Sequence, residues 1–503
     1  MLQKNERAWQ ASLDYNALFE AFCNYDLFQN GDALAVGNPF RRFIRPQDLN
    51  FMLKKPTLSR KDFVSNAGLM SQRILNVIYE QDLVFLPDDL YQTQLKNKMG
   101  NDQQKPETAP QFDENLRTDF HKFYDPHLKS LGSLLRPWLE TQSFDWLNQE
   151  ISVIGNYTPE TMRDYLLSRL EHENAGDSAL CNLIVNAKDP KNAAKMLLVQ
   201  FAGDFATEAS AMARNVLGNY GAPLSELFTI LIDEYGYGLH ERKHSTLFDK
   251  TLESVGMNSN IHHYWGHYLS SSLALTNYFH YISANHTLFY RYVGAMLYTE
   301  GTLHVSNRRQ SKMLRSVFGK SVHTEYFDEH VHIDQHHAVM AMDRVIMPLV
   351  KQSGEFAIHE VIRGFEEFAL LQSIADQDLM AQITWADQLA QNVEQINIAD
   401  PRLVKGNPQS FHETPSEISQ PHLHDDPELF AVVNNGLDFH ASPFHHVKLE
   451  AGQAVHIPAL RQHATIIGDQ PCHYQTVTLK SEGQGKTDPA APLVKTTISQ
   501  SVS

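Results

Sequence analysis

The sequence lacks the features that mark several classes of protein. Cysteine is scarce, and Cys23, Cys181 and Cys472 lie far apart without a C-x-x-C pair. Their separation argues against a disulfide framework or a cysteine zinc site and fits a reducing compartment. No apolar run approaches the ~18 residues that a membrane span needs, and the polar start, Met1 to Gln10, has no signal-peptide core. We therefore expect a cytoplasmic protein.

Positive charge is also in short supply. The 42 Lys and Arg residues face 59 Asp and Glu residues, which gives a formal net charge of −17. Because nucleic-acid binding needs basic patches that neutralise phosphates, we expect no nucleic-acid partner. The acidic balance is compatible with a cationic small-molecule substrate. With 503 residues, 42% of them hydrophobic, the chain has room for about three domains.

The chain divides into helical and strand-like parts, so we expect a multidomain α + β protein. Residues 1–145 show helical spacing without a catalytic motif and predict a helical N-terminal domain for packing or dimerisation. Residues 146–392 predict an all-α bundle of long helices. The Pro- and Gly-containing residues 393–420 predict a linker. Short apolar runs in 421–480 predict an antiparallel β-barrel, and the polar residues 481–503 predict a disordered tail.

The densest chemistry lies in the segment E-H-V-H-I-D-Q-H-H. Its residues His330, Asp334 and His337 are spaced i, i+4 and i+7, so they share one face of a helix. Two imidazoles and a carboxylate on one face suit Fe(II), Mn(II) or Zn(II). However, His332 and His336 form another i, i+4 pair on a neighbouring face. The segment alone is therefore also compatible with a histidine-rich surface helix.

Other predicted helices carry acidic residues among apolar ones. Glu208 stands in F-A-T-E-A-S-A-M-A, and Glu300 ends V-G-A-M-L-Y-T-E. A carboxylate on an apolar helix face must be paired, protonated or bound to a metal. Each residue alone could be a hydrogen-bonded core glutamate, but together with the His/Asp helix they indicate a shared site.

A third helical segment, D-E-Y-G-Y-G-L-H-E-R-K-H, offers alternative ligand pairs. His244 can be combined with Glu234, with Glu241 as an E-x-x-H pair of the ferritin-like type, or with His240. Glycine costs about 1 kcal/mol in a helix relative to alanine, so the two glycines indicate a distorted helix. Such a distortion would allow residues ten positions apart to reach one centre.

These motifs, taken in order, resemble those of the haem-oxygenase-like di-iron oxidases. Members of that family are helical bundles that bind two irons and activate O₂. The resemblance implies an O₂-dependent non-haem iron oxygenase and prefers Glu234 over Glu241. It assigns seven di-iron ligands: Glu208, Glu234, His244, Glu300, His330, Asp334 and His337.

The C-terminal part resembles the cupin signature, H-x-H followed by a Glu and by a later His. His422 and His424 are two residues apart, so on a strand both would point to the same side. His463 would return from a later strand to complete a mononuclear iron site, with Glu428 as a candidate fourth ligand. Leu460 stands where that signature commonly has glycine. The alternative is a metal-free cupin that binds a sugar or an acid.

The two parts in this order resemble the N-nitrosourea-forming metalloenzymes, over about residues 10–480. The resemblance implies that the di-iron site N-hydroxylates a guanidine or amine, either N-methyl-L-arginine or an arginine-like compound. The cupin iron would then rearrange the product oxidatively and form an N–N bond. It further implies O₂ as co-substrate, an external electron donor and a homodimer formed by the N-terminal helices.

Two other functions fit the residues. The chain could be a di-iron N-hydroxylase of an amino acid whose cupin is only structural. It could also be a non-catalytic metal-binding or sensor protein, although residues 1–145 show no basic helix-turn-helix that would serve as an output module.

Overall fold

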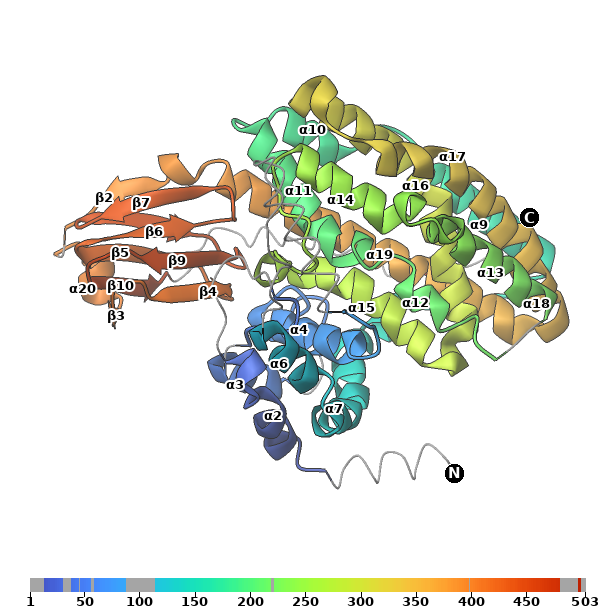
Figure 1. Ribbon diagram of the computed structural model, residues 1–503, viewed down its shortest axis with the longest axis horizontal. Helices are drawn as coiled ribbons and strands as arrows, with labels where there is room; N and C mark the ends of the chain where they lie inside the picture. The colour runs from blue at the N-terminus through green and yellow to red at the C-terminus, as the bar shows by residue number, and fades with distance from the viewer. Residues whose placement is uncertain are drawn as a thin grey trace, which may run out of the picture.

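The computed structural model combines a large helical body with a pair of β-sheets at one side (Figure 1). No helix in the described part of the chain is long and apolar enough to cross a membrane. The structure describes residues 13–29, 38–44, 46–55, 58–86, 114–218, 221–397, 399–479 and 496–498.

The N-terminal helices pack around one buried helix. The helix α4 contacts α7 on one side and α15 (Ser270–Ala284) of the central bundle on the other. Ser65 caps α4 by accepting a hydrogen bond from the backbone of Gly68, and all residues of α4 are buried. The N-terminal region is thus joined to the central bundle. Its helices are α2 (Tyr15–Cys23), α3 (Pro46–Leu53), α4 (Asn66–Glu80), α6 (Glu114–Phe123) and α7 (Pro126–Phe144).

The central bundle is built on two long helices, α16 (Phe289–Phe318) and α19 (Glu355–Ala386). Glycine lets them approach closely: a Cβ at Gly294 would lie 2.0 Å from the Val361 carbonyl oxygen. The other α-helices from residue 147 to 353 are α8 (Leu147–Glu150), α9 (Pro159–Glu173), α10 (Ala179–Val185), α11 (Pro190–Phe205), α12 (Ser210–Ala213), α13 (Ala222–Glu234), α14 (His244–Ser254), α15, α17 (Glu325–Val339) and α18 (Met347–Ser353).

Several helical segments of the bundle are interrupted. Between α11 and α12 the chain turns at Ala209, whose φ is 61°. Between α13 and α14 it turns at Gly236, with φ 58°, and passes through two short 3₁₀ turns, Gly236–Gly238 and His240–Arg242. After α17 the helix widens into a π-helix, Met340–Ile346. Such breaks and π-segments often accompany functional sites, and here all three adjoin one.

The C-terminal region consists of two antiparallel sheets. The five-stranded sheet has the order β2-β8-β5-β10-β3, and the four-stranded sheet has the order β4-β9-β6-β7. The prediction of antiparallel strands is confirmed. The strands are β2 (Val393–Gln395), β3 (Gln409–Glu413), β4 (Ile418–His422), β5 (Glu428–Asn434), β6 (Gly436–His440), β7 (His446–Glu450), β8 (Gln453–Ile457), β9 (His463–Ile467) and β10 (Cys472–Thr478).

Two expected boundaries need correction. The predicted linker, residues 393–420, supplies β2, β3 and most of β4, so the sheets begin well before residue 421. These three are edge strands, where proline is tolerated, and their proline-rich surroundings resemble a linker in sequence. Within the predicted disordered tail, Thr496–Ile498 forms β11, which pairs in parallel with β1 (Ile151–Val153). The remainder of the tail lies outside the described residues.

Candidate metal centres

One helix supplies three of the predicted ligands in the bundle. His330, Asp334 and His337 lie on the buried face of α17, as their spacing predicts, whereas His332 and His336 are exposed. The helix therefore turns the i, i+4, i+7 set inward and leaves the second histidine pair in solvent.

The other four predicted ligands reach the same place from separate elements. Glu300 lies on α16, Glu234 ends α13 and His244 begins α14. Glu208 lies in the break between α11 and α12. A Cβ at residue 236 would lie 2.4 Å from the Arg242 carbonyl carbon, so glycine there allows the chain to fold back and bring Glu234 to His244.

The seven residues form two metal-binding groups that have Glu234 in common. Within each group the potential ligand atoms all lie within 4.8 Å of one another. One carboxylate oxygen of Glu234 lies 2.6 Å from His244 Nδ1, and the other lies 3.5 Å from His337 Nδ1. The carboxylate thus faces both groups, as a bridging ligand does. One group is Glu208, Glu234, His244 and His330, and the other is Glu234, Glu300, Asp334 and His337.

The electrostatics of this cluster fit a pair of cations. Both carboxylate oxygens of Asp334 and Oε2 of Glu208 are buried and accept no hydrogen bond from the described residues. Burial lowers the pKa of His337, but Glu300 and other carboxylates outweigh it and raise the pKa to about 10. The four carboxylates of the two groups carry enough negative charge to balance two divalent ions, and the three histidines add neutral nitrogen ligands.

Further side chains hold the candidate ligands in place. Asp233 Oδ2 lies 3.0 Å from His337 Nε2, so it can accept a hydrogen bond from that nitrogen while Nδ1 faces the cluster. Tyr326 donates to Glu208 Oε1 at 2.8 Å, and its carbonyl accepts from His330 Nδ1 at 2.7 Å. Such partners fix the tautomer and orientation of metal-binding histidines. These roles were not predicted from the sequence, because they depend on contacts between helices.

The structure also distinguishes the alternative partners of His244 in the segment between α13 and α14. The Glu241 side chain is 79% exposed and lies beside Lys250, and His240 is exposed as well. Neither residue belongs to the two groups.

A cavity of about 730 Å³, counting its opening to solvent, adjoins the cluster. Besides candidate ligands it is lined by apolar and aromatic side chains, by threonines, and by the carboxylate of Asp204. Burial, with a smaller contribution from Glu208, raises the pKa of Asp204 to about 7. Asp204 belongs to no recognisable sequence motif and was therefore not predicted.

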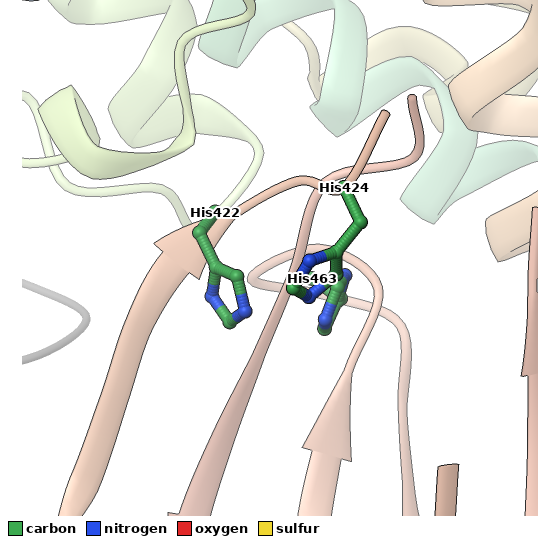
Figure 2. A group of neighbouring side chains, drawn as sticks. All are labelled: His422, His424 and His463. Atoms are coloured by element: carbon green, nitrogen blue, oxygen red, sulfur yellow. The ribbon is translucent and has the colours of Figure 1, made fainter. Parts of the chain in front are cut away.

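The second candidate centre lies between the sheets, where three histidine rings converge (Figure 2). His422 on β4 is paired in register with His463 on β9, and His424 follows β4 directly. The Nδ1 atoms of His422 and His463 donate to the carbonyls of Gln420 at 2.8 Å and Arg461 at 3.1 Å. These bonds leave the two Nε2 atoms free of protons for a metal ion.

The candidate fourth ligand and the unusual leucine also lie at this centre. Glu428 Oε2 lies 3.4 Å from His424 Nε2 but is outside the group formed by the three histidines. Leu460 adopts a φ of 64°, which favours glycine, and its N–H donates to the His424 carbonyl at 2.8 Å. The backbone conformation thus matches the glycine of the cupin signature, although the residue differs.

The three histidines open into a cavity of about 1800 Å³, counting its open side. The described residues that line it include six carboxylates and no lysine or arginine. Phe411, Tyr474 and Phe430 line it too, as stacked rings with centroids 5.1 and 4.5 Å apart. The N-terminal region contributes as well: its residues lining this cavity are Phe43, Asp48 and Asn66. No motif in residues 1–145 indicated that contribution.

Comparison with known proteins shows the family of the chain. A family model described as an iron-containing redox enzyme, of haem-oxygenase type, matches residues 195–373, which hold all seven candidate ligands of the bundle. The bundle is therefore that of an iron-containing redox enzyme.

Over nearly its whole length the chain is similar to a characterised enzyme. It is 40% identical over 468 residues to the nitrosourea synthase of Streptomyces achromogenes subsp. streptozoticus, which covers 92% of this chain and 94% of that enzyme. The chain belongs to the nitrosourea synthase family, and the resemblance seen in the sequence is confirmed.

Proposed function

We propose that this protein N-hydroxylates a guanidine or amine at a di-iron centre in the bundle and completes N–N bond formation at a cupin iron. The observation that carries the proposal is the pair of ligand groups that share Glu234. The substrate class is arginine-like, N-methyl-L-arginine or L-arginine. O₂ is the co-substrate, an external donor supplies electrons, and the N-terminal helices form a homodimer.

The donor set of the bundle supports two irons rather than one zinc. Seven ligand residues exceed the four that tetrahedral zinc uses. Carboxylates and neutral imidazoles suit oxidisable iron, and when bound the two ions supply O₂ activation. The chain's own part is to orient the ligands through Asp233 and Tyr326 and to hold the substrate in the adjoining cavity away from bulk water.

The β-sheet region supports a second step. Three histidines from two strands and a loop suit a facial site for one iron. The acidic cavity with its stacked aromatic rings suits a planar cation, which a hydroxylated guanidinium would be. We propose that these two sheets form a cupin barrel around the site.

A single-turnover experiment tests the proposal. Protein loaded anaerobically with Fe(II) is exposed to O₂ with N-methyl-L-arginine or L-arginine, and the products are identified by mass spectrometry. The proposal expects a product heavier by oxygen and then an N-nitroso species. His463→Ala should stop the reaction at the hydroxylated product.

The alternative is an N-hydroxylase whose β-region is only structural. Its signature would be a hydroxylated product without an N-nitroso species, unchanged by His463→Ala. If neither compound is altered by iron-loaded protein, the substrate proposal is wrong. Membership of an enzyme family argues against the non-catalytic sensor.

A further inference from the structure

The cavity beside the bundle cluster holds one carboxylate that belongs to neither ligand group. Asp204 lies on α11, four residues before Glu208, and lines the cavity together with Glu208, Glu234 and Glu300. No described residue donates a hydrogen bond to its side chain, and none of the described residues lining this cavity is a lysine or arginine. Within the described part of the chain, Asp204 therefore lines the cavity without a cationic or hydrogen-bonding partner.

The charge balance leaves Asp204 uncompensated. Two divalent ions would neutralise the four carboxylates of the ligand groups. When it is ionised, Asp204 is then the surplus negative charge of the cavity. A partly buried carboxylate without a counter-ion is unfavourable, and a cationic ligand would supply that counter-ion.

Aromatic side chains of the same cavity suit a flat cation. Phe279 and Tyr292 line the same cavity, and their rings meet edge to face with centroids 6.3 Å apart. A guanidinium is planar, pairs with a carboxylate through two parallel hydrogen bonds and stacks on aromatic rings. An ammonium has no such planar match.

We infer that Asp204 is the residue that binds the substrate guanidinium and places its nitrogen at the metal cluster. The inference rests on the proposed function and names the specificity residue of that same site. Because Asp204 precedes Glu208 by four residues, the group that it binds lies beside the cluster. The guanidinium, rather than the α-amino group of the substrate, is thus the end presented for hydroxylation.

The test measures how a charged and an uncharged ligand bind to the wild-type protein and to a variant in which residue 204 is neutral. Binding of L-arginine and of L-citrulline, whose ureido group is uncharged, is measured anaerobically by calorimetry on the iron-loaded full chain. Asp204→Asn should weaken L-arginine binding in the bundle by about 10- to 100-fold, as expected for a lost charge-assisted pair. Binding of L-citrulline should be unchanged. The acidic cavity between the sheets is intact in both proteins, so the difference reports the bundle.

Asp249→Asn is the matched control. Asp249 is another partly buried carboxyl whose pKa is raised to about 7 by burial and by a neighbouring glutamate, but it does not line the cavity. It should leave both affinities unchanged. Asp204→Ser provides a second variant in case the asparagine distorts the site. In both Asp204 variants the KM for hydroxylation should rise more than kcat falls.

The outcomes separate the two proposals. If wild-type protein binds and hydroxylates L-arginine and the Asp204 variants bind it equally well, the role of Asp204 is wrong and the proposed function survives. If the variants lose iron, Asp204 acts on the metal cluster and the inference is likewise overturned. If wild-type protein neither binds nor hydroxylates a guanidine, the proposed function fails, and this inference fails with it.

Discussion

Asp378→Asn should destabilise the contact between the bundle and the β-sheet region. Asp378 lies on α19, and Arg461 lies two residues before His463. Arg461 Nη2 is 3.0 Å from Asp378 Oδ1, and only 8% of each side chain is exposed. Arg461 Nη1 also donates to the Asp378 carbonyl at 3.0 Å, and Ser271 donates to the second carboxylate oxygen at 2.8 Å.

The magnitude follows from burial. Two unit charges 3 Å apart attract by about 5 kcal/mol at an effective dielectric constant of about 20. Removing one partner of a buried pair costs about 3–5 kcal/mol, because the other charge remains unpaired. Since the backbone carbonyl and the asparagine oxygen still accept hydrogen bonds from Arg461, we expect about 3 kcal/mol.

Two readouts measure the effect. Calorimetric unfolding should show the transition of the β-sheet region at lower temperature. Iron at His463 should also be retained less tightly, because the Arg461 carbonyl accepts the hydrogen bond from His463 Nδ1 at 3.1 Å. Asp378→Leu combined with Arg461→Met should recover most of the stability, since no charge is then left buried.

An exposed ion pair in the same region is the control. Glu394 and Arg402 lie 2.7 Å apart, with 41% and 42% of their side chains exposed. Glu394→Gln should cost less than about 1 kcal/mol. Equal effects of Asp378→Asn and Glu394→Gln would refute the reasoning, as would a double variant no more stable than the single one.

Three further substitutions test other contacts. Asp233→Asn should lower iron affinity in the bundle about 10- to 100-fold in an anaerobic competition titration, by loosening His337; unchanged affinity would exclude Asp233 as its orienting partner. Gly364→Val should lower the unfolding temperature markedly, because a Cβ there would lie 1.9 Å from the Arg291 carbonyl oxygen; an unchanged melting curve would contradict the close packing of α16 and α19. Burial, and after it the charges of His440 and Arg73, lowers the pKa of His267 from 6.5 to about 3. Neutral His267 therefore contributes its full stability to the fold above about pH 6.5. This contribution declines on acidification, by about 2 kcal/mol at pH 5. His267→Asn should therefore flatten the pH dependence of unfolding between pH 7 and pH 5, and an unaltered slope would place the acid sensitivity elsewhere.

Local spacing was sufficient to predict the residues that one element presents together. His330, Asp334 and His337 share a face because of helical periodicity alone. His422 and His424 were predicted together by strand alternation, although β4 ends at the first of them. The assignment of these residues as ligands stays a prediction.

Contacts between distant segments could not be predicted in this way. Spacing left both Glu234 and Glu241 open as partners of His244, and the turn at Gly236 brings Glu234 to His244. Asn66 lines the cavity beside the three histidines of the β-sheet region. Its position there depends on how the N-terminal helices pack, which the local sequence pattern does not encode. The edge strands around residues 393–420 were missed because they are short and flanked by proline and glycine.

Metal counting tests the central claim most directly. After anaerobic reconstitution with Fe(II) and removal of loosely bound metal, we expect about three irons per chain by plasma mass spectrometry, two in the bundle and one between the sheets. Asp334→Ala should remove iron from the bundle only, and His463→Ala should remove only the iron between the sheets. A chain that takes up no iron, or that binds only zinc, would contradict the account.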